Sequence, residues 1–457
     1  MAAREMNRRT FFKWAAAGAL AGRLSSPAIA APAEAAPSTR PNIVFILADD
    51  LGWAELGCYG NTFNETPNLD RLARDGMRFT QAYAAAPVCS PTRAALLTGQ
   101  WPQRFGIIDY LGPQDRTHFL RPEVTTLNEA IKPAGYVTGL IGKWHLTGDY
   151  SLGGGAPEKH GWDEVICSER IYIGGGSYFA PYKHLPHVEA PPGEYLTDRL
   201  TREAVEFIRR HKTEPFFLYL AHYAPHTALV GKQEKVTRFR AKPGAGPKQN
   251  NPQLAAMIES IDDGIGEILR VLDDLGLMSN TLVVFNSDNG GEDRVTSNAP
   301  LRAGKSHLYE GGIRVPLIVR WPAGIASGST CDVPVVTMDF FPTLIELAGL
   351  KPAPSLDGTS LVPLFKGRRE LPPRDLVWYY PLEKPHFLGG RSAGAIRSGD
   401  LKLIEFYDTG AIELYDLSKD VGEAHDLAGQ MRERAAELRV RLKQWREQVP
   451  ASVPPET

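Results

Sequence analysis

Short apolar runs that alternate with helical patterns limit the fold of this chain more than any other feature. Five of these runs adjoin polar residues: 43–48 before Asp49 and Asp50, 136–141 before Lys143 and His145, 216–220 before His222 and His226, 281–286 before Asp288 and Asn289, and 315–319 after Lys305. Such alternation predicts an α/β fold with a large mixed, mostly parallel sheet sandwiched by helices. Because ligands of open α/β sheets bind beyond the carboxyl ends of the strands, we expect these polar residues on one rim.

The sequence also predicts helices and a second sheet. Apolar residues three and four apart predict covering helices over residues 68–75, 197–210 and 254–275. From about residue 374 the pattern changes to short strands over 376–380, 395–397, 401–405 and 412–415, followed by a charged helix over 431–448. We therefore expect a main domain over residues 41–370 and a C-terminal subdomain, a small antiparallel sheet plus helix, over residues 371–457.

The first 30 residues have the order of features of an export signal. Arg8 and Arg9 precede a mildly apolar stretch over 14–22 and the small-residue site 28–30, an arrangement that resembles a twin-arginine signal peptide. The apolar stretch is far shorter than the roughly 20 residues that a spanning helix needs. Residues 31–40 are rich in Ala and Pro and predict a flexible lead-in. We expect export by the twin-arginine machinery to the periplasm or the medium, without a stable membrane anchor.

Charge and cysteine content exclude several classes of protein. The 51 basic and 53 acidic residues nearly cancel, so no general attraction for nucleic acid is expected. The four cysteines contain no CxxC pair, which argues against a disulfide scaffold and a zinc ribbon. They are Cys58, Cys89, Cys167 and Cys331. The sequence does not decide whether Cys167 and Cys331 form a disulfide or are free thiols.

Two polar clusters predict a metal site. Hard oxygen ligands that suit Ca²⁺ or Mg²⁺ follow two buried strands: Asp49, Asp50, Asp288 and Asn289. A single Asp after a strand is more often a turn former or a helix cap, but two such clusters favour a cation. Positive charge and proton donors for a substrate with several anionic oxygens come from Lys143, His145, His226 and Lys305. His222 keeps a plain structural interpretation.

Cys89 begins the segment CSPTR and then AALLTG, over residues 89–99. Pro91 falls in the first turn of a predicted helix, and Arg93 lies one turn further on. A helix N-terminus and a guanidinium both stabilise negative charge, so the residues alone predict an activated thiol or an anion-binding residue. The alternative, a buried inert cysteine, suits the other three cysteines better.

These segments together resemble the type I sulfatases, the formylglycine-dependent branch of the alkaline-phosphatase-like superfamily. Residues 89–99 match the Cys-x-Pro-x-Arg signature of that family, and residues 139–145 match its second signature. Further matches lie at 42–52, 287–291, 304–312 and 414–417, so the resemblance covers nearly all of the chain after the signal.

The resemblance implies a nucleophile that the gene does not encode directly. A separate maturation enzyme would oxidise Cys89 to formylglycine, and one hydroxyl of the hydrated aldehyde would attack sulfur with Asp288 as base. His226 and Lys305 would protonate or stabilise the leaving oxygen. His145 would then take the proton of the second hydroxyl of the sulfate ester and expel sulfate.

The family also implies one calcium ion and a set of sulfate-binding residues. The ion would be held by Asp49, Asp50, Asp288 and Asn289, and would orient and polarise the sulfate. Arg93 and Lys143 would hold the formylglycine, and Ser168 is the candidate for a polar residue that holds sulfate in some members. Phosphatase relatives use a second metal where this chain has Lys143 and Lys305, which favours sulfate monoesters.

The substrate is less clearly indicated. Six basic residues crowd an expected loop over 227–250, and this loop is either solvated surface or a rim that steers a polyanion: Lys232, Lys235, Arg238, Arg240, Lys242 and Lys248. His386 and Arg391 are candidate sugar contacts, with a plain surface loop as the alternative. We expect a sulfated carbohydrate as substrate. The alternatives are an aryl sulfate ester cleaved with broad range, a phosphonate or phosphate ester, and a non-catalytic role in binding sulfated glycans.

Overall fold

A nine-stranded sheet organises the chain, in the order β4-β3-β5-β1-β6-β7-β2-β8 with β9 beside β2. This computed structural model describes residues 40–171 and 178–449, so the predicted signal and nearly all of the lead-in lie outside the described residues. The strands of the sheet are β1 (Asn42–Ala48), β2 (Met77–Tyr83), β3 (Val137–Gly142), β4 (Glu164–Ile166), β5 (Phe216–Ala221), β6 (Thr281–Ser287), β7 (Arg314–Arg320), β8 (Ser329–Cys331) and β9 (Val335–Val336).

Strand direction decides what reaches the carboxyl edge of this sheet. Strands β1, β3, β4, β5 and β6 are parallel to one another, whereas β7 is antiparallel to both of its neighbours, β6 and β2. The register pairs Ala48 with Ser287, which sets Asp49 and Asp288 side by side. Because β7 runs the other way, the segment before it, with Lys305, arrives at this same edge. The predicted mixed, mostly parallel sheet is confirmed.

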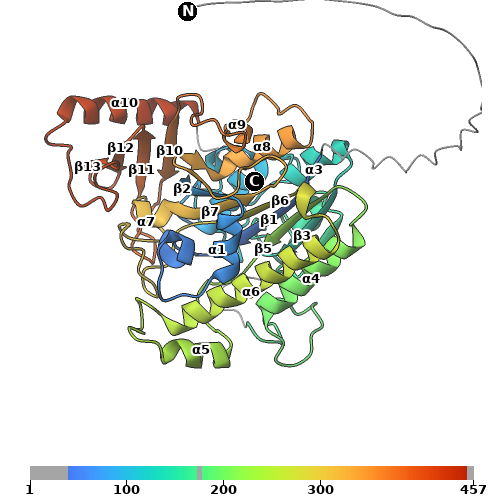
Figure 1. Ribbon diagram of the computed structural model, residues 1–457. Helices are drawn as coiled ribbons and strands as arrows, with labels where there is room; N and C mark the ends of the chain where they lie inside the picture. The colour runs from blue at the N-terminus through green and yellow to red at the C-terminus, as the bar shows by residue number, and fades with distance from the viewer. Residues whose placement is uncertain (1–39, 172–177, 450–457) are drawn as a thin grey trace, which may run out of the picture. The chain divides into compact units, whose positions relative to one another are not determined.

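Helices cover both faces of the sheet (Figure 1). Alternate residues of β1 enter two separate cores, Ile43 and Phe45 on one face and Val44 and Ile46 on the other. The first core is completed by α2 (Cys89–Thr98), α3 (Leu127–Ile131), α8 (Phe340–Leu347) and α9 (Val362–Phe365), and the second by α1 (Pro67–Arg74), α4 (Leu196–Arg210) and α6 (Pro252–Asp274). The predicted helices over 68–75, 197–210 and 254–275 are α1, α4 and α6, with ends shifted by one or two residues.

The predicted C-terminal strands and helix are also present. Strands β10 (Asp375–Tyr380), β11 (Ala393–Ser398), β12 (Leu401–Phe406) and β13 (Ile412–Asp416) form an antiparallel sheet, and α10 (Arg432–Gln448) packs on it. The helix buries Ala435, Leu438 and Leu442. By their contacts the described residues group as one compact unit, so the boundary between residues 370 and 371 stays a prediction.

The basic segment 227–250 is not the single loop that we expected. Residues Gln233–Arg240 form α5, because Val236 and Phe239 bury their side chains in a small core with Ala255 and Ala256 of α6. Four of its six basic residues form ion pairs: Lys232 with Asp198 (2.6 Å), Lys235 with Asp263, Arg238 with Glu65 (3.1 Å) and Lys242 with Glu65 (3.0 Å). These pairs neutralise much of the local charge, which favours a plain surface over a polyanion-steering rim.

Two further sequence questions concern cysteines and membranes. All four cysteines are free thiols, so Cys167 and Cys331 are not joined. Within residues 40–171 and 178–449, no helix has both the length and the apolar character needed to cross a bilayer.

Candidate active site

Cys89 is the first residue of α2, and the whole of this helix is buried. The loop before it is fixed by Thr92, whose Oγ1 accepts a hydrogen bond from the N–H of Ala86 (3.1 Å). The helix ends at Gly99, which adopts a left-handed φ of 67°. The Sγ of Cys89 lies 3.3 Å from Nδ1 of His145, which follows β3. The two signature segments therefore meet at one point.

Three buried carboxylates and three buried cations form ion pairs around Cys89. The pairs are Arg93 with Asp288 (2.7 Å), Lys143 with Asp49 (2.5 Å) and Lys305 with Asp50 (2.8 Å). Burial of a charge is very costly unless a partner of opposite sign is in contact, so each ion depends on its partner. The sequence-predicted set is thus assembled from five segments of the chain.

Close approach of two glycine-containing segments brings Lys305 to Asp50. The N–H of Gly290 donates to the carbonyl of Gly312 (3.0 Å), and a Cβ on Gly290 would lie 1.8 Å from the carbonyl oxygen of Gly311. The N–H of Lys305 donates to the carbonyl of Gly291 (3.1 Å). A side chain at position 290 would push these segments apart.

The carboxylates respond differently to their surroundings. Burial opposes the ionisation of Asp49 and Asp50, but the charges of Lys143 and Lys305 outweigh it and hold both pKa values below the usual range. Burial, together with the charge of Asp49, raises the pKa of Asp288 in spite of Arg93. Asp288 is therefore the strongest base of the three.

The thiol is not activated in the way that its helix position suggested. Burial raises the pKa of Cys89, even though Lys143 and Lys305 act in the opposite direction. Burial, with the charges of Lys143 and Arg93, holds the pKa of His145 well below its usual range. Desolvation opposes ionisation of this thiol more strongly than the nearby cations favour it, which argues against an activated thiol and favours the other alternative, an anion-binding residue. A protonated thiol faces a neutral imidazole.

The four predicted metal ligands fit a divalent cation. Oδ1 of Asp49 and Oδ1 of Asn289 are buried without a hydrogen-bond partner in residues 40–171 and 178–449, and Nδ2 of Asn289 donates to Oδ1 of Asp50 (2.8 Å). One ligand atom each of Asp49, Cys89 and Asp288 lies within 4.8 Å of the others. Unsatisfied carboxylate and amide oxygens beside two further carboxylates are ligands that Ca²⁺ and Mg²⁺ prefer.

His226 and His222 lie in different environments, as the sequence suggested. Nε2 of His226 lies 3.6 Å from Oδ2 of Asp50, and its side chain is 21% exposed, so it borders the buried cluster. His222 is buried, and burial lowers its pKa to about 4, which agrees with a structural role. Ser168 is buried, and its Oγ has no hydrogen-bond partner among the residues that the structure describes.

The two candidate sugar contacts, His386 and Arg391, have different partners. Burial and the charge of Lys305 lower the pKa of His386 to about 4, so this ring lies on the Lys305 side of the site. Arg391 donates two hydrogen bonds to the carboxylate of Asp408 (2.8 and 2.7 Å), and its guanidinium lies over the ring of Phe406. That arrangement commits Arg391 to the C-terminal sheet.

Sequence reasoning missed Glu169 and Asp109. The buried carboxylate of Glu169 accepts hydrogen bonds from the backbone N–H groups of Trp144 (3.0 Å) and His145. Asp109 accepts a hydrogen bond from the hydroxyl of Tyr380 (2.9 Å) two residues before Leu111, whose carbonyl contacts His145. Neither residue belongs to a matched motif. Glu169 follows the three-residue strand β4 and Asp109 follows only Ile107 and Ile108, and apolar runs this short are weak local signals.

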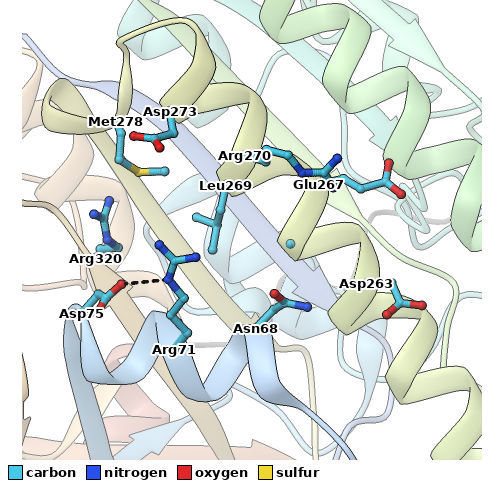
Figure 2. Close-up of a pocket in the computed structure, with 11 residues that line it drawn as sticks. Asn68, Arg71, Asp75, Asp263, Glu267, Leu269, Arg270, Asp273, Met278 and Arg320 are labelled. Carbon is cyan, nitrogen blue, oxygen red and sulfur yellow. Dashed lines mark hydrogen bonds and ion pairs between the residues drawn. The ribbon is translucent and has the colours of Figure 1, made fainter.

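A cavity of about 560 Å³ between α1 and α6 lies at the other edge of the sheet (Figure 2). It is lined by Met278, just before β6, and by Arg320, which pairs with Val283 near the start of β6. Its charged side chains are of both signs, and Arg71 is paired with Asp75 (3.3 Å). This cavity has no part in the cluster around Cys89.

A large mixed sheet with a buried cluster of acids, cations and one cysteine at its carboxyl edge defines an enzyme of the alkaline-phosphatase-like fold. More narrowly, the chain belongs to the sulfatase family. The Sulfatase family model matches residues 41–350, and the model for the C-terminal part of N-sulphoglucosamine sulphohydrolase matches residues 303–448. The resemblance noted in the sequence and the assignment as a sulfatase enzyme are confirmed.

Individual relatives agree with this assignment. Arylsulfatase A of Bos taurus is 33% identical over 476 residues, covering 91% of this chain and 89% of that protein. N-acetylgalactosamine-6-sulfatase of Homo sapiens is 36% identical over 374 residues, covering 74% of this chain and 68% of that protein. The crystal structure of Ps i-CgsB in complex with k-i-k-neocarrahexaose has a TM-score of 0.79 at 32% identity, covering 89% of this chain and 92% of that one.

Proposed function

We propose that this sulfatase is an exported enzyme that removes sulfate from a sulfated carbohydrate. The observation that carries the proposal is the convergence of Cys89 and His145, 3.3 Å apart, with the buried cations Arg93, Lys143 and Lys305. Cations held in place before substrate arrives stabilise the anionic oxygens of a transferring sulfuryl group without reorganisation. Relatives named for an N-acetylgalactosamine sulfate and solved with a neocarrahexaose support a carbohydrate.

Cys89 is proposed to be the site of formylglycine, which supplies the nucleophilic hydroxyl once a maturation enzyme has formed it. Asp288 is the base that takes the hydroxyl proton, because one of its carboxylate oxygens lies within 4.8 Å of the ligand atom of Cys89. His145 is neutral and lies beside the nucleophile position, so its Nδ1 accepts the proton that must leave when sulfate is released. A protonated, buried thiol fits a residue whose role begins only after modification.

Lys305 and His226 meet at Asp50 on the more open side of the cluster. From there they stabilise and protonate the departing alcohol oxygen. Lys143 and Arg93 hold the nucleophile position from the buried side. One calcium ion is proposed to be held by Asp49, Asp50, Asp288 and Asn289, where a dication supplies charge that polarises the sulfate oxygens.

Mass spectrometry of the peptide that contains Cys89, after coexpression with a formylglycine-generating enzyme, tests the nucleophile. We expect an aldehyde at position 89, and we expect Cys89→Ala to lose turnover while retaining its unfolding midpoint. An intact thiol in an active preparation, or an active Cys89→Ala variant, contradicts the proposal.

A panel of sulfated mono- and oligosaccharides, p-nitrophenyl sulfate and matched phosphate esters tests the substrate. We expect sulfated sugars to have the highest kcat/KM and phosphate esters the lowest. Arylsulfatase A matches along nearly its whole length, so a broad-range arylsulfatase is the second candidate. It is favoured if p-nitrophenyl sulfate is cleaved faster than every sugar in the panel.

A further inference from the structure

Residues 109–111 lie outside every sequence motif, yet hydrogen bonds join this segment to the nucleophile end of α2. The N–H of Leu111 donates to Oγ of Ser90 (3.0 Å), the residue after Cys89. The carbonyl oxygen of Leu111 lies 3.1 Å from Nε2 of His145. Asp109 and Tyr110 are therefore held beside the reacting residues.

The carboxylate of Asp109 has one oxygen committed to the protein and one that is not. Oδ1 accepts hydrogen bonds from the N–H of Tyr110 (2.8 Å) and from the hydroxyl of Tyr380 (2.9 Å). Oδ2 accepts no hydrogen bond from any residue in the described part of the chain. Asp109 is half-buried, and burial raises the pKa of its carboxyl although the charge of Lys305 acts in the opposite direction. A fixed carboxylate with a free oxygen near Lys305 is placed to accept a hydrogen bond from the alcohol part of a substrate.

The rings of Tyr110, His386 and Phe387 form an aromatic cluster in this part of the site. The ring of Tyr110 lies edge-on to His386, with centroids 5.5 Å apart, and to Phe387, 5.9 Å away. Phe387 is 65% exposed, and the guanidinium of Arg294 lies 5.6 Å from its ring centroid. An exposed apolar ring beside a carboxylate suits a ligand that has both C–H faces and hydroxyl groups.

We propose that Asp109 is a specificity residue that accepts a hydroxyl of the sulfated sugar through Oδ2, with Tyr110 and Phe387 against the C–H faces of that sugar. This inference rests on the proposed function and narrows it to alcohols that carry a further hydroxyl near the sulfate. A nitrophenyl ester offers no such hydroxyl. A site built to hydrogen-bond a substrate hydroxyl discriminates strongly against analogues without it, because its own polar group is then left unpaired.

Asp109→Asn is the sharpest test, since the amide keeps an oxygen for Tyr110 and Tyr380 and replaces the free oxygen by a donor. We expect kcat/KM for the best sulfated monosaccharide to fall about 10- to 100-fold and that for p-nitrophenyl sulfate to change less than about threefold. Phe387→Ser, at an exposed position that does not threaten folding, should shift the ratio of the two substrates in the same direction. Asp263→Asn, on the exposed face of α6, is the matched control and should leave the ratio unchanged.

The deoxy analogue of the same sulfated sugar identifies the interaction. For the wild type, kcat/KM should fall when the sugar lacks this hydroxyl, by about the factor that Asp109→Asn loses on the complete sugar. The Asp109→Asn variant should have similar kcat/KM values for the two sugars. Equal losses on sugar and nitrophenyl sulfate, or no loss on either, would overturn the inference while leaving the sulfatase function intact. A wild-type enzyme that cleaves nitrophenyl sulfate but no sulfated sugar would overturn both the carbohydrate proposal and this inference.

Discussion

Replacing Glu169 by Gln should slow turnover by loosening the backbone that carries His145. Glu169 is only 3% exposed, and its carboxylate accepts hydrogen bonds from the N–H groups of Trp144 (3.0 Å) and His145 and from the hydroxyl of Tyr223 (3.0 Å). His145 has a left-handed φ of 54°, which a non-glycine residue keeps only when its surroundings hold it there. We infer that Glu169 fixes this conformation and so keeps Nδ1 of His145 beside Cys89.

The size of the effect follows from these contacts. Gln has nearly the same shape but turns one of the two acceptor oxygens into a donor, which must then face an N–H or O–H group. A hydrogen bond to a charged acceptor contributes about 1.5–3 kcal/mol, and an unpaired buried donor costs a similar amount. A loss of about 2–3 kcal/mol expressed in the transition state lowers kcat roughly 30- to 160-fold.

Steady-state kinetics on p-nitrophenyl sulfate measures this effect, with the formylglycine content of each preparation determined by mass spectrometry. We expect kcat to fall while KM changes by less than about threefold, because Glu169 positions a proton acceptor and does not touch substrate. Glu158→Gln is the control, since Glu158 is exposed and lies 3.7 Å from Arg170. The reasoning is refuted if Glu169→Gln keeps the wild-type kcat. It is also refuted if the fall in kcat is fully explained by a smaller fraction of folded protein.

Three other predictions concern the metal, a buried ion triad and a buried histidine. Chelation of divalent cations should abolish turnover and lower Tm, and added Ca²⁺ should restore both. A ligand present at about 100 times its Kd stabilises the folded state by about 2.7 kcal/mol. Unchanged Tm and activity after chelation would contradict a metal site. Lys402→Met should lower the free energy of unfolding in urea by about 3–5 kcal/mol, since it strands two buried carboxylates. These are Glu310 and Glu423, which lie 2.9 and 2.8 Å from the Lys402 ammonium; a change below about 1 kcal/mol would show that the triad is not strongly coupled. Burial lowers the pKa of His222 to about 4, so its contribution to stability is fully present above its unfolded pKa of about 6.5 and is lost as pH falls towards about 4. The unfolding free energy should therefore drop by about 2 kcal/mol from this group between about pH 7 and about pH 5, and His222→Gln should show a shallower pH dependence in the same urea titrations.

Much of the fold could be predicted because its signals are carried by consecutive residues. The apolar runs of β1, β3, β5 and β6, the three-to-four spacing in α1, α4 and α6, and the break before β10 are all local patterns. The same holds for the segments that deliver Cys89, His145 and Asp288. Helix α5 escaped notice because Val236 and Phe239 are its only buried residues, too few to outweigh the many charges around them.

Other features of the site depend on pairs of residues that are distant in the sequence. Sequence determined that Lys305 belongs to the site, but only the reversed direction of β7 explains how it reaches Asp50. The clamp of Glu169 on His145 and the contact of Asp109 with Tyr380 arise from chain segments with no pattern of their own. The protonation of Cys89 was decided by the tertiary structure as well. A helix terminus is a local feature that the sequence reveals, whereas desolvation depends on every segment packed around the thiol, and here desolvation is the larger effect.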